Sequence, residues 1–236
     1  MELQAIRTKR LYVKVAEQLT QFVMDGTLKP GERFPSEREL AEKLGVSRPT
    51  IREAMIAMEL AGIIEIKTGS GIYVTKPGHS PDIMDAGGRD KGIGPFEILE
   101  IRYMIEGEAC ALAAARITDE QIQQLKDTLL EMEEEEKQAD ASEKADWKFH
   151  SIIAEACQNS AIYAVINWLW ELRNQSELSL AYLERLRKEG VHPSINDHRR
   201  ILEALEKRDP EKARIAMKMH IENATAAATG YFGKDR

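Results

Sequence analysis

The sequence has no long hydrophobic run, so neither a transmembrane helix nor a signal peptide is expected. Cysteine is also scarce. Cys110 and Cys157 both lie in helical patterns among small and apolar neighbours. This setting is typical of buried free thiols in a cytosolic protein, and a disulfide between the two stays open as the alternative. We therefore expect a cytoplasmic protein that has no membrane partner.

An excess of positive charge is missing as well, because the formal net charge is −7. That balance argues against a nucleic-acid-binding protein until the chain is divided. Residues 1–78 hold 12 basic and 10 acidic residues, whereas the remainder holds 21 and 30. The positive balance therefore lies in the N-terminal part, and an acidic remainder would discourage DNA from binding elsewhere.

The stretch from Ser36 to Glu53 is typical of two short helices joined by a tight turn. Ser36 with Glu39 fits a capping box, in which each side chain satisfies a free backbone donor at the helix start. Gly45 can take the left-handed conformation that ends the first helix. Ser47 can cap the second helix, and Pro49 lies in the first turn of that helix, where a missing N–H costs little. The pattern predicts a helix-turn-helix.

The second of these helices is expected to turn its apolar residues inward and to leave Arg48, Thr50 and Arg52 facing out. A short helix that exposes arginines and hydroxyls near its N-terminus suits the major groove of DNA. The alternative is an ordinary helical hairpin with a solvated basic face. Residues 63–67 and 72–74 then read as two strands around a turn that contains Gly69, which favours a wing.

These residues, from about 10 to 76, resemble the winged helix-turn-helix of the GntR family of bacterial transcription regulators. The resemblance implies that the protein binds double-stranded operator DNA. Pro49 departs from the family pattern, since many relatives have a hydroxyl residue there. Carried over by position, the candidate DNA contacts are Arg38, Ser47, Arg48, Thr50, Arg52 and Gly69.

The second half of the chain shows no strand signal. Residues 77–94 are rich in glycine, contain prolines and lack a periodic apolar pattern, so they predict a linker. From residue 95 to about 232 the pattern is helical, with Thr118 and Gln121 as a further capping box. The predicted fold is mostly α: a winged helix-turn-helix over 1–76 and an all-helical bundle of six or seven helices over 95–232.

Four residues of the predicted bundle have the chemistry of a metal site. Asp146 and His150 are four apart, so one helix face presents both, and His198 and His220 fall on two other predicted helices. Imidazole with carboxylate is a recurrent ligand set for zinc, nickel, manganese or iron. Each histidine taken alone fits an ordinary core or surface position better than a metal site, and it is the combination that favours a metal.

Residues 96–225 resemble the FCD domain of the FadR-type branch of the GntR family. The segments DWKFH, DHRRILEAL and AMKMHI match its three metal-ligand motifs, which implies that Asp146, His150, His198 and His220 bind a divalent ion. Zinc is the first choice, and nickel, manganese and iron are alternatives. An octahedral ion with four protein ligands keeps about two positions for water or an effector oxygen, which suits the sensing of a carboxylate or hydroxy acid.

The resemblance also implies an effector site. Arg102 resembles the arginine that meets the effector's carboxylate, for which a guanidinium fork is well shaped. The alternative for Arg102 is an internal salt bridge to Glu106 on the same helix. Asn159, Arg173 and Asn223 are further candidates for effector contacts.

Residues 94–102 and 216–223 resemble the hexuronate-responsive members of this branch. The sequence as a whole therefore predicts a homodimeric repressor of sugar-acid catabolism genes that leaves a palindromic operator when a carboxylate effector binds. Alternatives are an effector such as lactate, citrate or an amino acid, a metal-dependent hydrolase with a DNA-binding appendage, or a dimerisation module with a structural metal.

Overall fold

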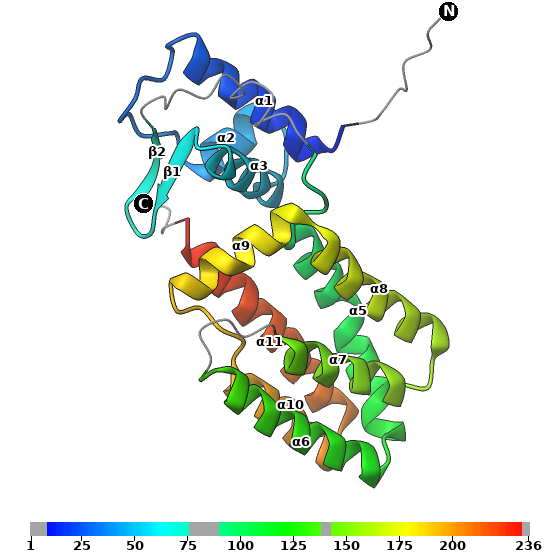
Figure 1. Cartoon of the computed structure of the whole chain (residues 1–236). Helices are drawn as coiled ribbons and strands as arrows, with labels where there is room; N and C mark the ends of the chain where they lie inside the picture. Colours follow the sequence, from blue (N-terminus) through cyan, green and yellow to red (C-terminus); the bar gives the residue numbers. More distant parts are fainter. Residues whose placement is uncertain (1–8, 76–89, 138–142, 233–236) are drawn as a thin grey trace, which may run out of the picture. The chain divides into compact units, whose positions relative to one another are not determined.

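The computed structural model describes residues 9–75, 90–137 and 143–232, which form two compact units (Figure 1). The expected linker lies largely outside the described residues. Among the described residues, no helix is long and apolar enough to cross a membrane. The first unit comprises Met1–Phe96, Ser176–Tyr182 and Thr229–Arg236, and the second comprises Glu97–Gln175 and Leu183–Ala228.

The first unit contains a helix-turn-helix followed by a two-stranded antiparallel sheet. Its helices are α1 (Leu11–Met24), α2 (Glu37–Leu44) and α3 (Arg48–Leu60), and its strands are β1 (Ile64–Lys67) and β2 (Gly71–Val74). The strands pair in a register that sets Ile64 opposite Val74 and Lys67 opposite Gly71. The predicted order of two helices and a wing is confirmed.

Local capping residues set the ends of α2 and α3. The Ser36 hydroxyl accepts from the Glu39 backbone N–H at 3.3 Å, and Ser47 caps α3 in the same way. Gly45 ends α2 with φ at +66°, as expected from its lack of a side chain. The other half of the predicted capping box is not formed, because the Glu39 carboxylate pairs with Lys43 at 2.7 Å instead.

Apolar burial holds the first unit together. The inward face of α3 is fully buried, and α3 contacts α1, α2 and β1. The buried apolar residues at the centre are Val13, Ala16, Leu19, Ile51, Ala54, Met55, Met58, Ile64 and Ile66. This core fixes one face of α3 and leaves the direction of its remaining side chains to be decided by polar partners.

The second unit is built from helices, as predicted, and no strand follows residue 76 among the described residues. α9 (Glu177–Lys188) begins in the first unit and continues into the second, and the last residues of α11 fall in the first. The other helices are α5 (Pro95–Arg116), α6 (Asp119–Glu135), α7 (Lys144–Ala156), α8 (Ser160–Gln175), α10 (Ile195–Glu206) and α11 (Pro210–Gly230).

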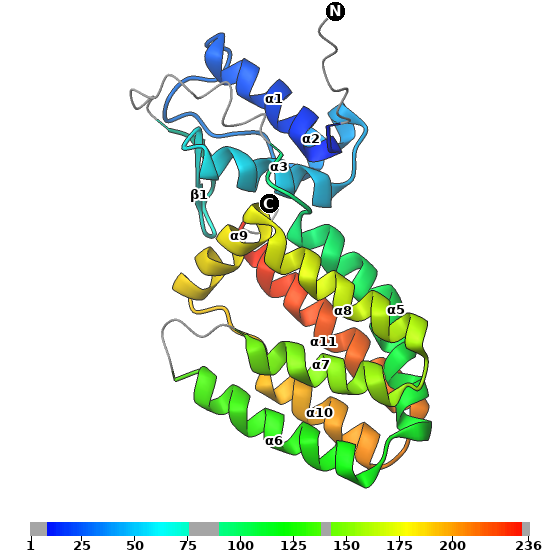
Figure 2. The same ribbon diagram turned by 45° about the vertical axis from the view of Figure 1, so that its right-hand side comes forward.

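Helix α7 occupies the middle of this bundle (Figure 2). It contacts α6 on one side and α8 on the other, and α6 in turn contacts α10. The buried cluster around α7 includes Leu125, Phe149, Ile153, Trp170, Ile201, Met217 and Ile221. Polar residues carried on the inner faces of α7, α10 and α11 are therefore brought together inside an apolar core.

Caps in the second unit follow the sequence closely. Thr118 and Gln121 form the predicted capping box at the start of α6. The Ser194 hydroxyl accepts from the Asp197 backbone N–H at 3.3 Å and begins α10. Both cysteines are buried and free, as predicted. These caps set where α10 begins, and thereby where its histidine lies.

Candidate metal centre, effector residues and DNA-binding helix

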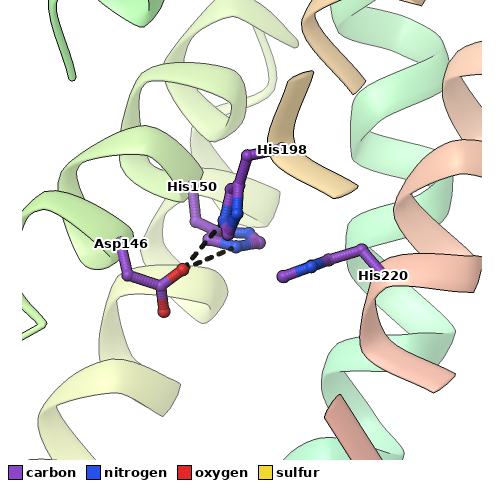
Figure 3. Close-up of side chains that lie close together, drawn as sticks. All are labelled: Asp146, His150, His198 and His220. Carbon is purple, nitrogen blue, oxygen red and sulfur yellow. Dashed lines mark ion pairs between the residues drawn. The ribbon is translucent and has the colours of Figure 1, made fainter. Parts of the chain in front are cut away.

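Four side chains from three helices converge inside the second unit (Figure 3). Asp146 and His150 come from α7, His198 from α10 and His220 from α11, and all four are buried. One ligand atom from each lies within 4.8 Å of the others. The structure thus brings together the four residues that the sequence analysis selected as metal ligands.

The local fold explains how three of these side chains point inward. Asp146 and His150 stand one helical turn apart on the same face of α7. The His198 Nδ1 lies 2.9 Å from the Ser194 carbonyl oxygen at the start of α10, so Nδ1 donates to that oxygen and Nε2 is directed toward Asp146. That Nε2 lies 2.9 Å from Asp146 Oδ1, and the His150 Nε2 lies 3.7 Å from the same oxygen (Figure 3).

The electrostatics of this cluster fit a cation. Asp146 Oδ1 and His198 Nε2 are buried and pair with each other, whereas the buried His220 Nδ1 has no hydrogen-bond partner among the described residues. Burial, and then the neighbouring His198 and His150, lower the pKa of His220 well below its usual value. Burial acts to raise the pKa of Asp146, but His150 and His198 outweigh it and hold that pKa well below normal. An ionised Asp146 and an uncharged His220 are what a divalent metal needs, whereas burial acts to lower the pKa of His150 and the neighbouring Glu106 outweighs it and raises that pKa.

A buried ion pair on α5 lies behind His150. Glu106 Oε2 is 2.5 Å from His150 Nδ1, and Glu106 Oε1 accepts from Arg102 Nε at 2.6 Å. Burial acts to raise the pKa of Glu106, but Arg102 and His150 lower it to about 2. Glu106 therefore stays ionised and orients the ring of a candidate metal ligand. Arg102 thus makes the internal salt bridge to Glu106 that was the alternative to an effector contact. The Arg102 Nη2 also lies 3.3 Å from His150 Nε2.

Two buried guanidinium groups stack on the Trp170 ring. The Arg102 Cζ lies 4.4 Å from the ring centroid and the Arg173 Cζ lies 4.2 Å from it. Arg173 also donates from Nη1 to Glu143 Oε2 at 3.0 Å, and Arg187 donates from Nε to Glu143 Oε1 at 3.2 Å. Of the predicted effector residues, Arg102 and Arg173 thus lie near the histidine cluster.

The two predicted asparagines have different surroundings. The Asn223 amide donates from Nδ2 to Asp197 Oδ2 at 2.9 Å, beside His198 in the sequence. The Asn159 amide oxygen accepts from the backbone N–H of Ala161 and of Ile162, so this side chain caps α8. The Asn159 side chain is exposed, and its amide oxygen is engaged in capping α8.

A narrow cleft of about 30 Å³ reaches the cluster through Asp146. Its lining includes Glu143, Arg187 and His192, none of which the sequence analysis assigned to a site. His192 stands just before Pro193, at a break between helices, where a loop residue is the usual interpretation. Glu143 and Arg187 belong to no recognisable motif. A single charged residue in a helical pattern is usually interpreted as exposed to solvent, so the sequence did not indicate a site at either residue.

The DNA-binding candidates of the first unit divide by exposure. The Arg48 and Arg38 side chains are 42% and 75% exposed, and Gly69 takes φ at +73° in the turn of the wing. The expected outward direction of Arg52 and Thr50 is wrong, because both residues are buried. Arg52 donates from Nε to the buried Glu37 carboxylate at 2.9 Å, and this ion pair turns its side chain inward. Thr50 lies with its hydroxyl 2.8 Å from that of Ser47.

The chain is similar to known regulators over most of its length. It is 35% identical over 229 residues to the Uxu operon transcriptional regulator of Escherichia coli, covering 93% of this chain and 87% of that protein. It is 34% identical over 215 residues to the Uxu operon regulator of Haemophilus influenzae, covering 91% and 80%. The Exu regulon transcriptional regulator of Escherichia coli is 32% identical over 219 residues, covering 91% and 83%.

Two family matches account for the two parts of the structure. Residues 11–74 match the family described as bacterial regulatory proteins, gntR family, and include the helix-turn-helix and the wing. Residues 97–223 match the FCD domain and include all four residues of the histidine and aspartate cluster. The chain therefore belongs to the gntR family of bacterial regulatory proteins and is a ligand-responsive, DNA-binding transcription regulator with a C-terminal FCD domain.

Proposed function

We propose that this protein is a cytoplasmic repressor of hexuronate catabolism genes and that a hexuronate bound at a divalent metal site lowers its affinity for the operator. The observation that carries this proposal is the buried cluster of Asp146, His150, His198 and His220 next to two buried arginines. The names of its Uxu and Exu relatives support a hexuronate as the effector.

The cluster supports the metal in this proposal. Its four side chains would supply one carboxylate oxygen and three imidazole nitrogens, a set that suits zinc first and also nickel, manganese or iron. A divalent ion held there would offer its remaining coordination positions to oxygen atoms of the effector. Arg102, Arg173 and Asn223 are the proposed polar residues around that effector, and Asn159 is the weakest candidate because it caps α8.

On the DNA side, α3 would enter the major groove of one half of a palindromic operator. The proposed DNA contacts are Arg48, Arg38, Ser47 and Gly69. Arg52 and Thr50 would contribute to DNA binding from buried positions on α3. A palindrome requires two copies of the chain related by a twofold axis. An exposed apolar face on α8 is the proposed surface through which two copies meet.

The hydrolase alternative has little support. The relatives of this chain are named as regulators, and two carboxylates close to the cluster residues, Glu106 beside His150 and Glu143 in the cleft with Asp146, are both engaged by arginines. We therefore propose that the metal serves binding and that the protein is not an enzyme.

The test is a thermal-shift and calorimetric titration of the full chain with glucuronate, galacturonate, lactate, citrate and amino acids. It is run on metal-loaded protein and on protein stripped with a chelator. We expect metal alone to raise the melting temperature, and one hexuronate to raise it further only when metal is bound. The same hexuronate should release an operator fragment in a gel-shift titration.

A matched pair of variants controls this test. His220→Gln should abolish both the metal effect and the hexuronate effect. His192→Gln changes a histidine outside the four-residue cluster and should retain the metal. If lactate, citrate or an amino acid stabilises the protein instead, the assignment of a hexuronate as the effector is wrong. The proposal that the protein senses a small carboxylate then still holds. Turnover of an ester or a sugar acid would favour the hydrolase.

A further inference from the structure

Glu143 holds two arginines from two different helices. It directly precedes α7, and its side chain is 10% exposed. One carboxylate oxygen accepts from Arg173 on α8 at 3.0 Å, and the other accepts from Arg187 on α9 at 3.2 Å. A carboxylate held by two guanidinium groups in a largely buried site is the environment in which a carboxylate ligand would bind.

The backbone of Glu143 is unusual. Its φ is +54°, in the left-handed region that residues with a side chain seldom adopt, and its side chain does not cap α7. Such conformations persist where surrounding contacts enforce them, and they gather at ligand sites and switches. At Glu143, the two ion pairs hold the side chain of the residue that directly precedes α7.

Arg173 and Arg102 differ in how fully their donors are used. Arg102 gives both Nε and Nη2 to Glu106, which lies one turn further along the same helix. Arg173 gives Nη1 to Glu143, while its buried Nε has no hydrogen-bond partner among the described residues. Arg173 therefore has a donor left for an incoming acceptor, whereas the fork of Arg102 is already taken.

The position of Glu143 connects this ion pair to the metal cluster. Glu143, Arg187 and Asp146 line the same cleft. Glu143 also stands three residues before Asp146, at the start of the helix that carries two of the four candidate ligands. A molecule that reaches the cluster through this cleft passes Arg187 and the Glu143 carboxylate, to which Arg173 donates from Nη1.

We propose that Arg173 and Arg187 form the site for the effector's carboxylate, and that Glu143 fills this site as an internal competitor which the effector displaces. This inference rests on the proposed function. An arginine as buried as Arg173 needs an anion, so exchange of one carboxylate for another preserves its charge balance. The exchange releases the start of α7 and so passes effector binding on to the position of that helix.

The experiment measures hexuronate affinity by calorimetry on the metal-loaded full chain. Glu143→Gln keeps the shape of the side chain and removes its charge, so the effector no longer competes with an internal carboxylate. In this variant, the effector forms its charge-assisted hydrogen bonds to arginine without first breaking those of Glu143. We therefore expect the dissociation constant to fall by about 10-fold or more. Arg173→Gln should weaken binding by about 10-fold or more, and adding it to Glu143→Gln should remove the gain.

Glu108→Gln is the matched control. Glu108 also bridges two basic side chains, Arg214 at 2.9 Å and Lys218 at 3.2 Å, but it does so on the surface of α5. Its substitution should leave the affinity within about twofold. If Glu143→Gln does not fold, Glu143→Asp replaces it: the shorter side chain loosens both contacts, so tighter binding is again expected.

A purely structural role for Glu143 predicts the opposite sign. In that case Glu143→Gln lowers the melting temperature and leaves hexuronate binding equal or weaker, which overturns the inference. If the wild-type protein binds no hexuronate, the proposed function fails and acetate becomes the probe. Acetate, with chloride as the salt control, should still raise the melting temperature more for Glu143→Gln than for the wild type, and an equal rise overturns the inference.

Discussion

At the scale of single residues, two arginines near the start of α3 have different roles. Arg48 and Arg52 both donate to Glu37, but their side chains are 42% and 9% exposed. Arg52→Ala removes one partner of a buried ion pair, and we expect it to lower the free energy of unfolding by about 3 kcal/mol. Arg48→Ala should change that free energy by less than about 1 kcal/mol and should mainly weaken operator binding.

Urea unfolding and a fluorescence-anisotropy titration at fixed salt measure the two effects separately. Non-specific DNA of the same length is the control, because a loss confined to the operator indicates a base contact. If Arg52→Ala leaves stability intact and weakens only operator binding, Arg52 reaches the DNA from its buried position. Unchanged operator affinity in Arg48→Ala would argue against α3 as the recognition helix.

The same scale shows how far the sequence predicts the site. The four cluster residues were predictable because Asp146 and His150 are one helical turn apart and all four lie in recognisable motifs. The pairs of Glu143 with Arg173 and Arg187 were not, since they join residues 30 and 44 positions apart. Such contacts depend on how α7, α8 and α9 pack, and helical periodicity carries no information about that. The burial of Arg52 was missed for a related reason, because its partner Glu37 lies on α2.

At the scale of elements, the ends of the helices follow from local chemistry. The Thr118 hydroxyl accepts from the Gln121 backbone N–H at 3.2 Å, and the Gln121 amide oxygen accepts from the Thr118 N–H at 3.1 Å. Thr118→Ala should therefore lower the free energy of unfolding by about 1 kcal/mol, the usual effect of losing an N-cap. Thr118→Ser keeps a hydroxyl and should cost much less. Calorimetric unfolding of both variants checks this, and equal losses would assign the effect to packing of the threonine methyl group.

Caps of this kind explain why the order and the approximate bounds of the helices were predictable. Ser47, Thr118 and Ser194 each accept from a backbone N–H three residues ahead, so a short window of sequence contains the whole interaction. The box at Ser36 shows the limit of that reasoning. Its second half depends on the Glu39 side chain, which has an alternative partner in Lys43 one turn further along the exposed surface of α2.

At the scale of the whole molecule, charge is divided between the two parts of the chain. The N-terminal 78 residues carry a small positive balance, and the acidic residues gather in the remainder. This division favours an approach to DNA by the helix-turn-helix and disfavours contact through the FCD domain. The small size of the positive balance means that specific contacts by α3, rather than bulk charge, must supply much of the operator affinity.

The helix α8 carries the surface through which two chains are proposed to meet. Trp168 is 56% exposed and Val165 is 37% exposed, and both lie on one face of this helix with two exposed alanines. Large apolar side chains in a row at the surface are typical of a protein interface. Trp168→Glu should therefore yield a monomer of half the mass in light scattering. It should also weaken operator binding steeply, because two linked recognition helices bind far more tightly than one.

Leu130→Glu is the matched control, since Leu130 is 61% exposed on α6, a helix that packs on α7 and α10. This variant should keep the mass and the operator affinity of the wild type, and circular dichroism of both variants should match that of the wild type. A Trp168→Glu protein that remains dimeric would move the interface elsewhere. The next candidate is then α11, where Ile215 and Met219 are 49% and 45% exposed and lie one turn apart. Because a twofold axis brings the same surface of both chains together, one added carboxylate places two negative charges in the interface, which is why a single substitution suffices for the test.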